Sequence, residues 1–229
     1  MVNTDFLSLA VDKIMEGKPL FASNVLNDLI TVEQFESMIN LTPFVRPDRF
    51  IPTHQKHLPE FTWNVPYWST ENNGYPSSVL EHVVSTGTCY IKDASRITKN
   101  INEVCGFLES KTNIPTDCHI FFSMNPTALQ NSFGVHKDRQ HNIIVQVDGR
   151  THWKVGTKIH DVDVPNNIED FFEDDNLSVD IEMAPGDAVV IPAGVFHQPK
   201  NITKRISASF SMAVIAKDGI CVDRKWVNW

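Results

Sequence analysis

Two strand-like runs, far apart in the chain, each carry a histidine that could bind a metal ion. The first comprises residues 133–138 (FGVHKD), and the second comprises residues 185–197 (PGDAVVIPAGVFH). Because residues two apart in a strand point to the same face, His136 and Asp138 can bind one ion together. His197 must then reach that ion from another strand. Two imidazoles and one carboxylate on one face of an ion form the ligand set that suits non-haem Fe(II) and O2 chemistry.

The composition is that of a folded domain in a reducing compartment. With 229 residues, of which 41% are hydrophobic, the chain can form one large domain or one domain with an extension. The net charge of -8 argues against a broad nucleic-acid or anionic-membrane surface, although a local basic groove stays open. The four cysteines form no CxxC pair, and we find neither a signal peptide nor a run of about 20 apolar residues. We therefore expect a soluble, cytoplasmic protein without a membrane partner.

Helical patterns come before most of the strand patterns along the chain. Apolar spacing predicts helices over residues 4–16 and 97–108, and shorter helices beginning at Thr31 and covering residues 77–84. The β-rich runs, bounded by turn residues, cover residues 87–91, 118–124, 142–147, 151–155, 177–183, 188–191 and 205–215. Asp148-Gly149 predicts a hairpin turn between two of them. This order predicts a mainly β fold, a jelly roll of about eight antiparallel strands with N-terminal helices packed outside.

These patterns divide the chain into three regions. Residues 1–85 form a helical and irregular region that wraps the core, residues 86–215 form the metal-binding jelly roll, and residues 216–229 form a tail. The many prolines and aromatic residues between Thr42 and Pro76 predict a wrapping segment, or one that lines a substrate entrance. The tail ends with two tryptophans, which pack on the domain or on a partner subunit in such tails, so a homodimer stays open.

The second run resembles the second motif of the cupin superfamily. The spacing of that motif is met by Gly186, Pro192, Gly194, His197 and Asn201. The first cupin motif is met only in part, because Asp138 stands where a second histidine is usual and the usual glutamate is absent. Over residues 87–212 the chain therefore resembles the JmjC-like Fe(II)/2-oxoglutarate oxygenases. This branch includes the ribosomal-protein hydroxylases and a related asparaginyl hydroxylase.

The resemblance implies a catalytic metal centre and a cosubstrate. Fe(II) would be held by His136, Asp138 and His197, and 2-oxoglutarate would bind to it. Members of this branch hydroxylate or demethylate protein side chains, so a protein or peptide substrate is expected, while a small-molecule substrate stays possible. A cupin metal protein without 2-oxoglutarate and a non-catalytic jelly-roll binding module are the two alternatives.

One departure from the branch concerns the far carboxylate of 2-oxoglutarate. Members anchor it with a Lys or Arg that, counted from His136, corresponds to Thr151, and threonine cannot neutralise a carboxylate. The best candidate is Arg205 with Ser207, because another branch uses an Arg-x-Ser pair on its last strand. A surface position for Arg205 is the alternative. We also expect Asn142 to contact the cosubstrate or to be a buried amide. Four further histidines are expected to be structural or exposed: His119, His141, His152 and His160.

Overall fold

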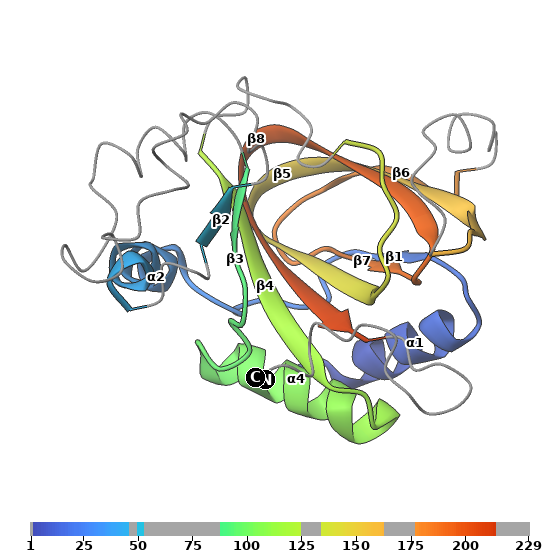
Figure 1. Cartoon of the computed structure of the whole chain (residues 1–229), viewed down its shortest axis with the longest axis horizontal. Coiled ribbons are helices and arrows are strands. Elements are labelled where there is room, and N and C mark those ends of the chain that lie inside the picture. Colours follow the sequence, from blue (N-terminus) through green and yellow to red (C-terminus); the bar gives the residue numbers. More distant parts are fainter. Residues whose placement is uncertain (1, 46–49, 53–87, 125–133, 163–176, 214–229) are drawn as a thin grey trace.

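The computed structural model describes residues 2–45, 50–52, 88–124, 134–162 and 177–213, apart from the side chains of residues 40–52 (Figure 1). The helices are α1 (Thr4–Met15), α2 (Val32–Val45) and α4 (Lys99–Thr112). The strands are β1 (Leu20–Ala22), β2 (Phe50–Pro52), β3 (Cys89–Ile91), β4 (Thr116–Ser123), β5 (His141–Ile159), β6 (Val179–Met183), β7 (Ala188–Ile191) and β8 (Val195–Met212). The predicted helix over residues 77–84 and the tail lie outside the described residues.

The three described helices confirm the helical patterns, and their caps explain where they begin. Thr31 caps α2 as predicted, because its hydroxyl accepts the backbone N–H of Gln34 while the Gln34 side chain accepts the N–H of Thr31. Thr98 caps α4 in the same position, accepting the N–H of Ile101 at 3.1 Å. No helix in the described part of the chain is both long enough and apolar enough to cross a membrane.

The sheet confirms the mainly β jelly roll. Its strand order is β1-β7-β5-β8-β4-β3-β2, and every pairing is antiparallel. In addition, β6 pairs with the second half of β5. The long strands β5 and β8 pair with each other from His141 opposite Met212 to Ile159 opposite Val195. They curve together around one side of the sheet (Figure 1). The edge strands β1 and β2 were not predicted, because three residues are too few to show a periodic pattern.

The hairpin predicted at Asp148-Gly149 is wrong. A single strand, β5, runs through both residues, and its register with β8 shifts on either side of them, which is a β-bulge. The even-numbered residues 142, 144 and 146 face the inside of the roll before the bulge, and the odd-numbered residues 151, 153 and 155 do so after it. The bulge therefore keeps one face of β5 inside. The predicted strand 205–215 is likewise the second half of β8.

We expect Gly149→Ala to lower the free energy of unfolding by about 3 kcal/mol or more. Gly149 has a φ of 73°, and a Cβ there would overlap the carbonyl oxygen of Lys204 on β8. Thermal denaturation followed by circular dichroism should show a melting temperature lower by roughly 6 °C or more. Gly106→Ala is the matched control, because Gly106 lies in α4 with nothing within 4 Å of the added Cβ. Equal melting temperatures for the two variants would contradict this account of the bulge.

Two apolar clusters hold the fold on the two faces of β5. Ile143 and Val145 belong to the larger cluster, which joins the sheet to α1 and α4. Ile144 belongs to the smaller one, with Trp153 and Val155, between the curved halves of the roll. The helices α1 and α4 lie side by side against the outer face (Figure 1), as predicted for helices packed outside. The inner face is left to form a site.

Candidate metal centre

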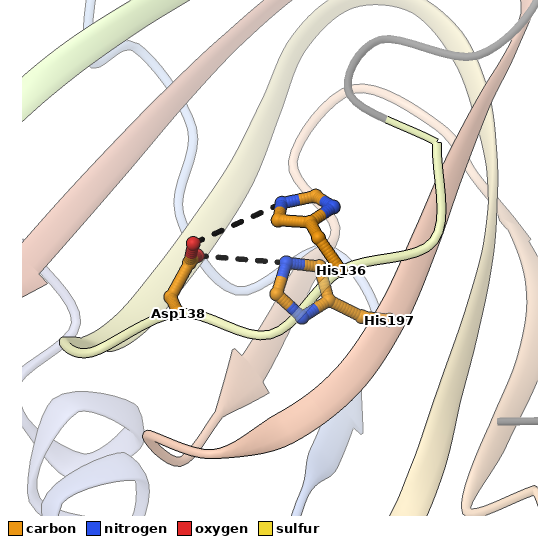
Figure 2. Close-up of side chains that lie close together, drawn as sticks. All are labelled: His136, Asp138 and His197. Carbon is orange, nitrogen blue, oxygen red and sulfur yellow. Dashed lines mark ion pairs between the residues drawn. The ribbon is translucent and has the colours of Figure 1, made fainter. Parts of the chain in front are cut away.

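The structure brings the three predicted ligands together (Figure 2). His136 and Asp138 lie on the segment just before β5, and His197 lies on β8. The backbones of His136 and His197 exchange two hydrogen bonds of 3.1 and 2.8 Å, and the Gly194 N–H donates to the Asp138 carbonyl at 2.9 Å. These bonds fasten the segment onto β8. One ligand atom from each side chain then lies within 4.8 Å of the others.

Backbone carbonyls determine which nitrogen of each imidazole faces the site. His136 Nδ1 lies 3.0 Å from the Gly134 carbonyl oxygen, and His197 Nδ1 lies 3.0 Å from that of Val195. A carbonyl oxygen only accepts, so each Nδ1 carries the proton and each Nε2 turns its lone pair toward the site. These Nε2 atoms lie 3.8 and 3.5 Å from the oxygens of Asp138. Burial, and then the nearby His136, lower the pKa of His197 to about 4, so its imidazole is neutral at pH 7.

Asn142 orients the carboxylate. Its Nδ2 donates to Asp138 Oδ2 at 2.7 Å and lies 3.5 Å from the carbonyl oxygen of Gln140. Its Oδ1 accepts the hydroxyls of Ser211 at 2.6 Å and of Ser209 at 3.4 Å. Because a carboxylate only accepts, the amide can face Asp138 only through its N–H, which determines its orientation. The buried-amide expectation for Asn142 therefore fits its position, which is 4% exposed.

A cavity of about 290 Å³ opens from the metal ligands into the roll, close to the lower end of the range for small-ligand pockets. Arg205 lines it and is 2% exposed, so the surface position considered for this residue is wrong. Its guanidinium carbon lies 5.4 and 5.5 Å from the ring centroids of Phe121 and Trp153. Its Nη1 is buried and has no hydrogen-bond partner among the described residues.

Arg205 is therefore a buried cation that no anion balances within the described residues, and it is suited to bind one. Burial lowers its pKa to about 10, so the guanidinium stays charged at pH 7. Its Nε donates to Ser207 Oγ at 2.9 Å, but a neutral hydroxyl does not balance its charge. An uncompensated buried charge destabilises a fold, and a carboxylate is the group whose geometry matches a guanidinium fork. The inner end of the cavity is therefore suited to bind a carboxylate.

Thr151 occupies the position at which the branch carries its basic anchor. It is fully buried, and within the described ranges its hydroxyl has no hydrogen-bond partner. Arg205 pairs with Gly149 in register, and its guanidinium reaches the ring of Trp153, two residues beyond Thr151. The Arg205 side chain thus extends along the part of β5 that includes Thr151. Arg150 faces away from the cavity, where it pairs with Glu182.

Sequence analysis missed most of the cavity wall. Tyr90, His119 and Phe121 lie in it, on β3 and β4, and Gln140 and Trp153 also line it. His119 lies opposite Ser209 of β8, and burial lowers its pKa to about 4. Only the pairing of β4 with β8 places these residues, and no local pattern predicts that pairing. The remaining histidines have structural contacts: His141 with the Ala193 N–H, His152 with Asp180, and His160 with the ring of Phe196.

Comparisons with known proteins agree with this fold. Residues 102–218, more than half of the chain, match the model of the JmjC domain family. The X-ray structure of YcfD from Escherichia coli has 18% identity and a TM-score of 0.55, covering 91% of this chain and 54% of that one. A complex of this ribosomal oxygenase with cobalt and 2-oxoglutarate has 17% identity and a TM-score of 0.54, covering 88% and 49%.

A prolyl-4-hydroxylase from Pseudomonas putida has 13% identity and a TM-score of 0.50, covering 90% of this chain and 98% of that one. At such identities these likenesses show the fold. The chain spans about half the length of the YcfD chains. No protein of curated function matches it.

Proposed function

This chain belongs to the JmjC domain family, and on that premise we propose that it is an Fe(II)- and 2-oxoglutarate-dependent oxygenase that hydroxylates a protein or peptide side chain. One observation carries the proposal: the three metal ligands face the same cavity as a buried Arg205, whose Nη1 has no hydrogen-bond partner among the described residues. A metal cupin without a cosubstrate has no need of such a cation. The solved neighbours, a ribosomal oxygenase crystallised with cobalt and 2-oxoglutarate and a prolyl-4-hydroxylase, favour a protein substrate.

The donor set fits Fe(II). His136 and His197 would each offer the lone pair of Nε2, and Asp138 would offer one carboxylate oxygen while the other accepts from Asn142. With Fe(II) and 2-oxoglutarate bound there, the site would supply the chemistry by which one atom of O2 enters a substrate C–H bond and the other enters 2-oxoglutarate, which becomes succinate and CO2. The protein holds the ligands in place, and His197 and Arg205 are almost fully buried.

We assign the far carboxylate of 2-oxoglutarate to Arg205. Ser207 supports Arg205 and does not donate to the cosubstrate. Its hydroxyl accepts from Arg205 and donates to Gln146, which leaves it no proton for a ligand. Thr151 has a free hydroxyl within the described residues and can add one hydrogen bond. Asn142 uses its amide on Asp138 and the two serines, so we assign it to the carboxylate ligand and not to the cosubstrate.

Thermal shift and turnover together test the proposed function. We expect a divalent metal alone to raise the melting temperature, and 2-oxoglutarate at 100 times its Kd to add about 2.7 kcal/mol of stability, or roughly 5–10 °C. With Fe(II) and air, the protein should form succinate slowly without substrate. A shift with metal but none with 2-oxoglutarate would favour the cupin alternative, and no shift with either would favour the non-catalytic binding module.

A further inference from the structure

Behind Arg205 lies a buried chain of hydrogen bonds that ends at the bulge of β5. Arg205 Nε donates to Ser207 Oγ at 2.9 Å, and Ser207 Oγ donates to Gln146 Oε1 at 3.0 Å. Gln146 Nε2 in turn donates to the carbonyl of Asp148 at 2.7 Å. We propose that Gln146 is a positioning residue for 2-oxoglutarate, acting through Ser207 and Arg205. This inference rests on the proposed function, since it takes Arg205 as the anchor.

Every proton in this chain has only one possible direction. A guanidinium cannot accept, so the Ser207 oxygen must accept from Arg205 and its single proton must go to Gln146. The carbonyl of Asp148 cannot donate, so the Gln146 amide must turn its NH2 group toward the bulge and its oxygen toward Ser207. The amide is thus held in the one orientation in which it can support the serine.

The backbone of Gln146 is held as firmly as its side chain. Its N–H donates to the Asp187 carbonyl and its carbonyl accepts the Gly186 N–H, each at 2.9 Å, so the turn before β7 anchors it. Gln146 and Ser207 are both 0% exposed. A flexible arginine side chain would lose freedom on binding a ligand, but here one edge of the fork is already fixed. The Nη groups are left to face the carboxylate.

The consequence is specific to ligands that carry a far carboxylate. If Gln146 is lost, the Ser207 hydroxyl can turn and the Arg205 fork is no longer held at Nε. 2-Oxoglutarate should then bind more weakly, while 2-oxopentanoate, which has the same chain length without the far carboxylate, should not be affected. The side-chain hydrogen bonds of Gln146 go to Ser207 and Asp148 and not to a metal ligand, so metal binding should not change either.

The test uses the full chain loaded with Co(II) and measures Kd for both ligands by calorimetry. In Gln146→Met we expect the Kd of 2-oxoglutarate to rise about tenfold, and that of 2-oxopentanoate and the Co(II) absorption spectrum to stay as in the wild type. Ser207→Ala should produce the same pattern. Because both residues act through one chain, the double variant should be no weaker than the weaker single variant. Ser207→Ala also tests the same link if Gln146→Met does not fold.

Gln34→Met is the matched control, because Gln34 caps α2 far along the chain from the cavity residues and should change neither ligand's Kd. An unchanged Kd of 2-oxoglutarate in Gln146→Met would overturn the inference alone. Equal weakening of both ligands, or additive effects in the double variant, would also overturn it. If the wild type did not prefer 2-oxoglutarate over 2-oxopentanoate, the anchor role of Arg205 would fail, and the inference would fail with it.

Discussion

Asp138→Ala should bind Fe(II) poorly and lose succinate formation by at least about 100-fold. Loss of a residue that merely orients a metal ligand weakens metal sites by about 10–100-fold, and Asp138 is itself a proposed ligand and the only acid of the three. Two imidazoles would remain, without a negative charge to balance the metal. The measurements are metal content by mass spectrometry after gel filtration, and succinate by NMR.

Asp180→Ala is the control for this prediction. Asp180 is an exposed aspartate on β6 that pairs with His152, away from the cavity. We expect it to keep the metal content and turnover of the wild type. Because the Asp138 side chain is one-third exposed, its loss should leave the fold intact, which circular dichroism can verify. Equal metal content and equal turnover in the two variants would rule out the metal centre.

Arg205→Met should raise the Kd of 2-oxoglutarate by roughly 30-fold to several thousand-fold, since truncating one partner of a buried charge pair costs about 2–5 kcal/mol. The same change should leave the ligand-free protein at least as stable as the wild type, because a buried cation without an anion is replaced by an apolar side chain. Affinity and stability should thus move in opposite directions. Calorimetric titration and thermal denaturation measure the two quantities.

Lys200→Met, which removes an exposed cation from the same strand, should change neither quantity. Adding Thr151→Lys to Arg205→Met tests the relation between the two positions. Arg205 extends along the stretch of β5 that contains Thr151, so a lysine at 151 should recover part of the lost affinity. Tight binding of 2-oxoglutarate by Arg205→Met alone would show that the anchor lies elsewhere.

The metal ligands could be predicted from the sequence because their signals are local. His136 and Asp138 stand two residues apart, and His197 follows a strand and a Pro-Gly turn whose spacing is characteristic. Arg205 was harder to interpret. Its alternation with Ser207, Ser209 and Ser211 is typical of one face of a strand, but only the pairing of β8 with β4 and β5 decides that this face is inside.

The interpretation of Asp148-Gly149 failed for a different physical reason. An Asp-Gly pair with a positive φ at the glycine fits a hairpin turn and a bulge equally well at the level of the backbone. The two structures differ only in which segment pairs with the residues that follow. Here β8 pairs on both sides of the pair, so the strand continues. The strand that pairs with these residues decides between a turn and a bulge. That strand, β8, lies far along the chain, so the local sequence does not predict it.

The bulge also determines which face the second half of β5 presents to the cavity. If β5 kept its present length but paired with β8 without the bulge, simple alternation would turn Thr151, Trp153 and Val155 toward the outside. The change would resemble a frameshift, since each later side chain would exchange places with its neighbour. It would also move the Trp153 ring away from the guanidinium of Arg205. Gly149, whose positive φ allows the bulge, should therefore not be replaceable, even where neighbouring residues change.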